Sequence, residues 1–342
     1  MATWGGNAIY EGGRYHLFAA AMLNGCGLES WGSNSYIVRA EADNITGPFT
    51  AMASVLGPFA HNPTVRHLPD GSVLLYMIGD GTGRTPRDCT NGSSFTSQLH
   101  LDTLGGATAA PLPPGTVGTG IFVAHAPSVH GPWEVIEVTS PNSSRSDDLC
   151  GGWTNPSPHV APDGSVTLAF QSSRCEPFPV GKHYVALIGT AQAPTWRGPY
   201  SLLSQHAVNK EQPWCPAGQA EDPFLWRSAR GWHLLMHGMC PTGVAQARYA
   251  FSLDAATWHN SPRQAYSYRV EFDDGTYATF VRMERPQLGF SKGRLNTTTG
   301  AFGAPDVLYN GVCDGPLSCL GLNRKGVHYM TWTLARPLES AA

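Results

Sequence analysis

The chain has 342 residues, of which 14% are charged and 42% hydrophobic, and its formal net charge is −3. It has no basic block, which argues against a nucleic-acid partner, and no run of 18 apolar residues that would cross a membrane. The 39 glycines, 27 prolines and the scattered 10 Trp, 12 Tyr and 13 Phe indicate short strands joined by turns.

Five segments of the chain repeat one plan, in which a strand, a tight turn and a second strand follow one another. The first four copies are GGNAIYEGGRYHLFAAA (5–21), HNPTVRHLPDGSVLLYMIG (61–79), TNPSPHVAPDGSVTLAFQS (154–172) and EDPFLWRSARGWHLLMHGM (221–239), and ERPQLGFSKGRL (284–295) begins a fifth. Asp-Gly in the second and third copies is a strong hairpin signal. The second strand is almost continuously apolar, which is typical of a strand covered on both faces.

Three of the units continue with Ala and then Gly-Pro-aromatic, at 47–49, 131–133 and 198–200, which marks an outer hairpin and a turn into the next unit. This plan predicts an all-β fold, a five-bladed β-propeller with four antiparallel strands per blade, as one domain over residues 1–342. The expected blades are 1–56, 57–140, 150–205, 215–280 and 281–338. A repeating sandwich is the alternative. Residues 80–118 have no periodicity, and we expect this long loop to project over one mouth of the propeller.

The eight cysteines and the sequons predict a secreted, disulfide-bonded glycoprotein. Cys150 and Cys175 lie at almost equal distances before and after one predicted hairpin turn, and Cys215 and Cys240 do the same about another. Antiparallel pairing of the strands would bring each pair together, so we predict the disulfides Cys150–Cys175 and Cys215–Cys240. Cys313–Cys319 would close a small loop, and Cys26–Cys89 would link blades 1 and 2. Asn-X-Ser/Thr sequons occur at Asn44, Asn91, Asn142 and Asn296. A cytosolic protein with free buried thiols is the alternative. We expect that a native leader ahead of Met1 has been removed.

The first strand of each propeller blade lines the central channel, so the residues at its start should surround one pocket. These residues are Asn7, Asn62, Asn155, Asp222 and the region of Glu284. Glu221 and Asp222 are then two adjacent carboxylates at the rim of a pocket, where they can act on a substrate. The competing interpretation is that Asn before Pro serves as a turn or cap residue, and that an Arg neutralises each carboxylate.

The sequences of the predicted blades resemble those of the five-bladed propeller glycosidases of glycoside hydrolase families 32 and 43. AEDPFLWRSARGWHLLMHG (220–238) resembles the Arg-Asp-Pro blade of family 32, MERPQLGF (283–290) its Glu-Cys-Pro segment, and IYEGGRYHLFAA (9–20) its first blade. In family 32 a first-blade Asp is the nucleophile, the Asp of Arg-Asp-Pro stabilises the transition state, and the Glu of Glu-Cys-Pro is the general acid. The resemblance therefore implies that Asp222 is the stabilising residue and Glu284 the general acid.

This sequence departs from the family pattern at the nucleophile. The matching position falls near Trp4, and counting two blades back from Asp222 gives Asn62, so neither alignment finds a carboxylate. Glu221 also replaces the Arg of Arg-Asp-Pro. Either Glu221 takes over as the base, or Glu284 and Asp222 work as the pair, or the site only binds. A chain start that was trimmed too close is the fourth alternative. Glycoside cleavage needs an acid at the leaving oxygen and a carboxylate on the other face of the sugar, and burial near a second carboxylate is expected to keep Glu284 protonated near neutral pH.

These observations predict a secreted glycoside hydrolase, monomeric and without a cofactor, that removes a terminal sugar from an oligo- or polysaccharide. A structural cation in the central channel is an alternative, but the sequence has no set of metal-binding residues with a suitable spacing to support it. Substrate contacts are expected from Asn7, His61, Asn62, Trp153, Asn155, His159 and Arg285, since side-chain amides bond sugar hydroxyls well. The two His residues and Trp153 can equally serve as turn and packing residues. The alternatives are a carbohydrate-binding propeller without catalysis, a phosphorylase, because family 130 propellers also carry Glu-Asp-Pro, or a polysaccharide lyase.

Overall fold

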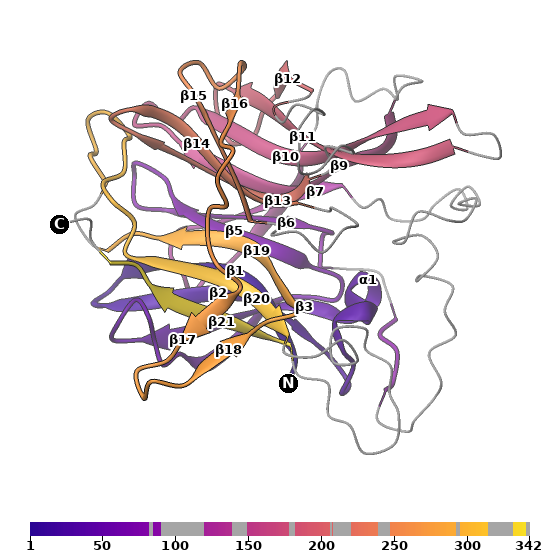
Figure 1. Ribbon diagram of the computed structural model, residues 1–342, viewed down its shortest axis with the longest axis vertical. Coiled ribbons are helices and arrows are strands. Elements are labelled where there is room, and N and C mark those ends of the chain that lie inside the picture. The colour runs from indigo at the N-terminus through magenta and orange to yellow at the C-terminus, as the bar shows by residue number, and fades with distance from the viewer. Residues whose placement is uncertain are drawn as a thin grey trace.

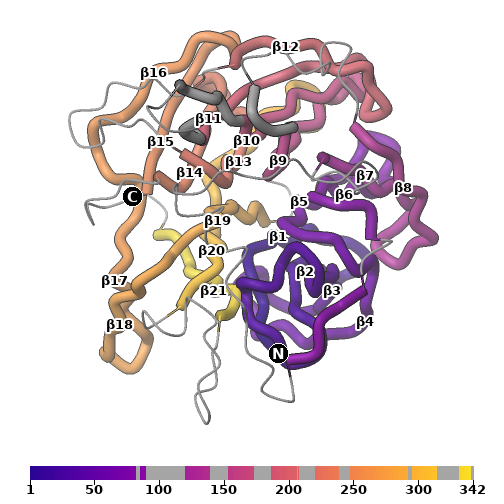
Figure 2. The backbone as a smooth tube through the Cα atoms, turned by 90° about the vertical axis from the view of Figure 1, so that its right-hand side faces the viewer, coloured from indigo at the N-terminus to yellow at the C-terminus, as the bar shows by residue number. Residues whose placement is uncertain are grey.

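The computed structural model describes residues 1–81, 85–89, 120–138, 149–177, 182–205, 207, 220–238, 247–291, 295–313 and 331–339. In this part of the chain, five antiparallel sheets follow one another around a common axis (Figure 2). Blade 1 contains β1 (Thr3–Glu11), β2 (Arg14–Met22), β3 (Ser35–Ala42) and β4 (Thr50–Leu56), and blade 2 contains β5 (His61–His67), β6 (Val73–Ile78), β7 (Ile121–Ala126) and β8 (Glu134–Glu137).

Blades 3 and 4 have the same four-stranded plan. Blade 3 contains β9 (Leu149–Val160), β10 (Val166–Pro177), β11 (Lys182–Ala193) and β12 (Ser201–Ser204). Blade 4 contains β13 (Ala220–Ser228), β14 (Gly231–Gly238), β15 (Ala247–Ser252) and β16 (His259–Asn260). Blade 5 has three strands in the described residues, β19 (Arg282–Gly289), β20 (Val307–Cys313) and β21 (Trp332–Pro337), and a separate hairpin of β17 (Arg269–Glu271) and β18 (Tyr277–Thr279) precedes it (Figure 1).

The five-bladed β-propeller predicted from the repeats is therefore confirmed. Its innermost strands β1, β5, β9, β13 and β19 contact one another in turn, and β19 contacts β1, so the ring is closed. Between blades 1 and 5 the closure includes hydrogen bonds from the Thr3 amide to the Thr331 carbonyl (3.0 Å) and from the Thr333 hydroxyl to the Gly5 carbonyl (2.7 Å). No helix in the described residues has the length and apolar character that crossing a membrane requires.

A cluster of buried apolar side chains packs between each pair of neighbouring blades. Between blades 4 and 5, for example, the fully buried Phe224 packs with Met283 and Val312. Each such side chain contributes roughly 1.5–3 kcal/mol when it leaves water. The almost wholly apolar second strands, such as VLLYMI in β6, are buried along their whole length because each blade is covered on both faces.

Each inner strand has the same bulge, near its start in four blades and in the middle of β9 in blade 3, where two of its residues oppose one residue of the second strand. The first bulge residue has a left-handed backbone in all five blades, and these residues are Gly5 (φ 60°), Asn62 (53°), Asn155 (49°), Asp222 (55°) and Arg285 (54°). Gly, Asn and Asp tolerate this conformation better than other residues. The left-handed backbone at the bulge is therefore the local reason for the Asn-Pro and Asp-Pro pattern. Arg285 is unusual among these five residues, because arginine rarely adopts this conformation.

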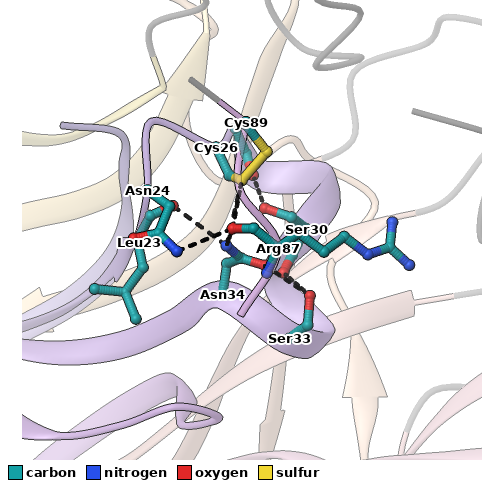
Figure 3. The surroundings of a disulfide bond; sticks show 9 residues. Leu23, Asn24, Cys26, Ser30, Ser33, Asn34, Arg87 and Cys89 are labelled. Atoms are coloured by element: carbon teal, nitrogen blue, oxygen red, sulfur yellow. Dashed lines mark hydrogen bonds between the residues drawn. A yellow bond between two sulfur atoms is a disulfide. The ribbon is translucent and has the colours of Figure 1, made fainter. Parts of the chain in front are cut away.

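The predicted disulfide between Cys26 and Cys89 is confirmed (Figure 3). Cys313 is also disulfide-bonded. The expected partner Cys319, the pair Cys215–Cys240 and the side chains of Cys150 and Cys175 lie outside the described residues. So do Asn91 and Asn142 and most of the predicted loop over residues 80–118.

Candidate active site

Three carboxylates and one imidazole form a cluster at the starts of β13 and β19 in blades 4 and 5. One donor atom from each of Glu221, Asp222, His237 and Glu284 lies within 4.8 Å of the others. Glu221 opposes His237 across the β13–β14 pair, and the bulge places Asp222 beside it. Glu284 occupies the same position in blade 5 that Glu221 occupies in blade 4. The three predicted catalytic carboxylates are therefore brought together.

His237 lies between two of these carboxylates. Its Nδ1 is 3.1 Å from Glu221 Oε1 and its Nε2 is 3.8 Å from Glu284 Oε1. Burial alone would lower the pKa of His237, but the charge of Glu284 and the hydrogen bond and charge of Glu221 outweigh it and raise the pKa to about 9. His237 is thus an imidazolium at neutral pH. His237 was not among the residues predicted from the sequence, although a His in the apolar strand WHLLMHG, opposite Glu221 in a hairpin, is a signal that could have identified it.

Two arginines of blade 5 complete the charge balance of the cluster. Arg282 Nε lies 2.8 Å from Glu284 Oε1, and Arg285 Nη1 lies 3.0 Å from Asp222 Oδ1. Arg285 is almost fully buried, whereas the side chain of Arg282 is 38% exposed and that of Glu221 is 21% exposed. The cluster therefore opens to solvent on the side of Arg282 and Glu221.

The two adjacent carboxyl groups of blade 4 differ in their electrostatics. Burial and the neighbouring charge of Glu221 raise the pKa of Asp222 to about 6, against the opposing effect of Arg285. Burial also acts to raise the pKa of Glu221, but the hydrogen bond and charge of His237, with help from Arg282 and Arg285, lower it below its usual value. Glu221 is therefore the ionised member of the pair, and Asp222 holds a proton for part of the time near pH 6.

The position of blade 1 that corresponds to Asp222 of blade 4 is Gly5. The bulge register aligns Trp4 with Glu221 and Glu284, and Gly5 with Asn62, Asn155, Asp222 and Arg285. The side chain of Arg285 occupies the space next to Gly5, since a Cβ atom on this glycine would lie 2.4 Å from Arg285 Cγ. The start of the inner strand of blade 1 therefore has no carboxylate, and a guanidinium group bound to Asp222 and to the Asn62 carbonyl lies against it.

Two of the predicted sugar-binding amides form part of this same ring. Asn62 donates to the Asn155 side-chain oxygen (2.8 Å), and Asn155 donates to Gln171. The predicted equivalence of Asn7 with these residues is wrong, because Asn7 lies two residues beyond Gly5. Its amide makes two hydrogen bonds to the backbone of Val65, at 3.1 and 2.9 Å, and thereby joins blade 1 to blade 2.

The remaining predicted contacts occupy different places. His61 is buried at the start of β5, where Trp31 stacks on its ring at 5.1 Å, and burial with the charge of Arg285 lowers its pKa to about 3. Trp153 stacks on Phe170 at 4.0 Å and packs against the cluster between blades 2 and 3. His159 follows Asn155 by four residues along β9, roughly 13 Å, and lies buried against Trp232 and Phe302. The structure thus places His159 away from the carboxylates.

The four donors of the cluster are also chemically suited to a metal ion. However, Glu221, Asp222 and Glu284 already face three cationic groups, His237, Arg282 and Arg285. The negative charge of the cluster is therefore balanced by the protein itself, and a divalent cation would have to displace these partners.

Comparison with known proteins supports the fold. No protein-family model and no curated protein matches the sequence. The structure is similar to a family 117 glycoside hydrolase of the marine bacterium Zobellia galactanivorans, with a TM-score of 0.58 and 11% identity over 98% of this chain and 83% of that one. It is also similar to an α-L-arabinofuranosidase of Lactobacillus brevis, with a TM-score of 0.54 and 11% identity over 98% and 91% of the two chains. The chain thus has the five-bladed propeller fold of these glycosidases, as its sequence resemblance implied.

Proposed function

We propose that this protein is a glycoside hydrolase that removes a terminal sugar from an oligo- or polysaccharide. The observation that carries this proposal is the cluster of Glu221, Asp222, His237 and Glu284 at the starts of two neighbouring inner strands. Hydrolysis of a glycoside needs a proton donor for the leaving oxygen and negative charge near the positively charged transition state. The cluster offers both within one part-exposed site.

Glu284 is the proton donor in this proposal. It matches the general acid of family 32 by position, and it passes the proton of the His237 imidazolium, 3.8 Å away, to the leaving oxygen. Glu221 and Asp222 stabilise the positive charge that develops on the sugar ring. Glu221 suits this task because it is ionised and part-exposed.

Buried polar atoms near the cluster supply contacts for sugar hydroxyls. Within the described residues, His61 Nδ1 and Asn62 Oδ1 are buried without a hydrogen-bond partner. A buried polar atom without a partner costs free energy that a ligand can recover. A sugar hydroxyl that donates to Asn62 would complete the hydrogen bonding of that amide.

The test is to screen aryl glycosides and plant and algal oligosaccharides, and then to compare Glu284→Gln with wild type. Loss of a general acid should lower turnover by about 10²–10⁴-fold on substrates with poor leaving groups and spare activated aryl glycosides. Glu137→Gln, which removes the same charge from the exposed outer strand β8, is the matched control. Equal turnover of the poor substrate by wild type and Glu284→Gln would place the proton donor elsewhere.

Gly5 favours a second candidate, a carbohydrate-binding propeller without catalysis, because the first-blade carboxylate is absent. Calorimetry separates the two functions. Binding of an oligosaccharide that is recovered intact after prolonged incubation would support the binding protein and contradict the hydrolase.

The proposal includes secretion. The Cys26–Cys89 disulfide and the exposed sequon residues Asn44 and Asn296 are compatible with an oxidising secretory compartment. Expression in a secretory host, followed by enzymatic removal of N-glycans and mass spectrometry, tests this part. Unmodified Asn44 and Asn296 together with reduced cysteines would contradict it.

A further inference from the structure

The segment between β2 and β3 of blade 1 reaches both neighbouring blades at the end where the carboxylates lie. It carries a 3-10 turn, η1 (Leu28–Ser30), and the single-turn helix α1 (Trp31–Asn34) (Figure 1). Trp31 stacks on His61 of blade 2, and Glu29 Oε1 lies 3.8 Å from Arg282 Nη1 of blade 5. The segment therefore spans the rim of the site on the side of blade 1.

Covalent and polar contacts hold this segment in place. The Cys26–Cys89 disulfide ties it to residues 85–89, and the Asn34 side chain both donates to the Arg87 carbonyl (2.8 Å) and accepts from the Arg87 amide (3.1 Å) (Figure 3). Leu28, the residue before Glu29, is buried in an apolar cluster with Trp4. Glu29 thus lies in a segment that is held in place by this cluster as well as by the contacts of Cys26 and Asn34.

One guanidinium group connects Glu29 to the proposed proton donor. Arg282 presents Nη1 to Glu29 and Nε to Glu284, at 3.8 and 2.8 Å. Glu29 and Glu284 are therefore held apart by the guanidinium group that contacts them both. Inverting glycosidases also hold their acid and base apart, which leaves room for a water molecule. Glu29 is also part-exposed, at 21%.

We infer that Glu29 is the general base of the hydrolysis, supplied by the loop of blade 1 in place of the carboxylate that the inner strand lacks at Gly5. This assignment rests on the proposed function. It gives a role to the carboxylate that the disulfide-tethered loop of blade 1 carries to the rim. Glu221, Asp222 and His237 then keep the stabilising roles given above.

Hydrolysis by this route needs only water and the side chains of the site. The Glu29 carboxylate takes a proton from a water molecule, and the water oxygen bonds to the anomeric carbon on the face opposite the leaving oxygen. The glycosidic C–O bond breaks, and its electron pair stays on the leaving oxygen, which takes the proton that His237 supplies through Glu284. The products are the free sugar, with inverted anomeric configuration, and an alcohol. Glu29 then loses its proton to solvent, and His237 regains one from solvent.

The stereochemistry of the product provides the first test. Proton NMR of the earliest product, formed by wild type from the best substrate of the glycoside panel, should show inversion. The competing pair, Glu221 and Glu284, has oxygens within 4.8 Å of each other, close to the spacing of roughly 5–5.5 Å that gives retention. Retention would therefore overturn the assignment of Glu29 while leaving the hydrolase intact. A wild-type protein that cleaves none of the panel would instead refute the proposed function, and the assignment with it.

The second test is Glu29→Gln, with Glu137→Gln as the charge-matched control. Removal of a general base should lower kcat by roughly 10²–10⁴-fold. The loss should be the same for good and poor leaving groups, in contrast to Glu284→Gln. Added azide, a nucleophile that needs no base, should restore turnover and give a glycosyl azide of inverted configuration. A Glu29→Gln protein that keeps its melting temperature and its kcat to within threefold of the control would contradict the inference.

Discussion

Gly5 and Arg285 are in such close contact that a Cβ atom on the glycine would lie 2.4 Å from Cγ of the arginine. Gly5 also has φ 60°, a backbone conformation that L-residues rarely adopt. We predict that Gly5→Ala lowers the free energy of unfolding by about 2–4 kcal/mol, from backbone strain and overpacking together. Denaturant unfolding measures this value.

Gly12→Ala is the matched control for this prediction. Gly12 has φ 59°, and no atom lies within 4 Å of the position of its Cβ. It therefore shares the backbone strain with Gly5→Ala but not the steric clash, and it should cost about 1 kcal/mol. If both substitutions cost the same, Arg285 does not fill the space beside Gly5 in solution.

Asn155→Ala should lower stability, although the sequence predicted that Asn155 contacts the sugar, with a turn or cap role as the competing interpretation. The Asn155 amide joins Asn62 to Gln171, and its φ is 49°. Alanine removes both hydrogen bonds and tolerates this φ poorly, so we expect a loss of about 1–3 kcal/mol in denaturant unfolding. Asn155→Gly relieves the backbone term and should be less destabilising than Asn155→Ala. Equal losses for the two variants would show that the hydrogen bonds and not the backbone decide the choice of Asn.

Stability should fall as the pH rises from about 6.5 to 9, because His237 then loses its proton. The pKa of His237 is raised to about 9 in the folded state, above its unfolded value of 6.5. Its contribution is therefore fully present below pH 6.5 and is lost as the pH rises through 9, by roughly 2–3 kcal/mol. Denaturant unfolding across this range measures the slope. His237→Gln should flatten it, and His259→Gln, at an exposed position, should leave it unchanged.

Hydrolysis should not depend on a divalent cation at the cluster. His237, Arg282 and Arg285 already neutralise the three carboxylates, so a cation would have to compete with ion pairs of 2.8–3.1 Å. Activity measured after treatment with EDTA should remain within about twofold of the untreated enzyme, given that the cluster is balanced by cations of the protein. A loss of more than tenfold that calcium or zinc restores would reveal a metal site in this cluster.

The sequence by itself determined the propeller, because each blade repeats a local pattern. A strand, a tight turn and an apolar second strand recur at 61–79 and 154–172 with the same spacing, and each copy folds through contacts between residues close in the chain. The same pattern located Glu221, Asp222 and Glu284, since their place at the start of an inner strand is a local property. The pairing of Cys26 with Cys89 also followed from the sequence, as the pair remaining after the other six cysteines were matched.

Only the tertiary structure decided which groups meet these carboxylates. Arg285 crosses from blade 5 to Asp222 of blade 4 and to the Asn62 carbonyl of blade 2, 223 residues away in the chain. The bulges shift the register, so Gly5 and not Asn7 aligns with Asn62, a difference that sequence spacing does not reveal. Glu29 and Arg282 are brought together by the closure of blade 5 on blade 1. Such contacts depend on how whole blades pack around the axis, and this packing leaves no periodic trace in the sequence.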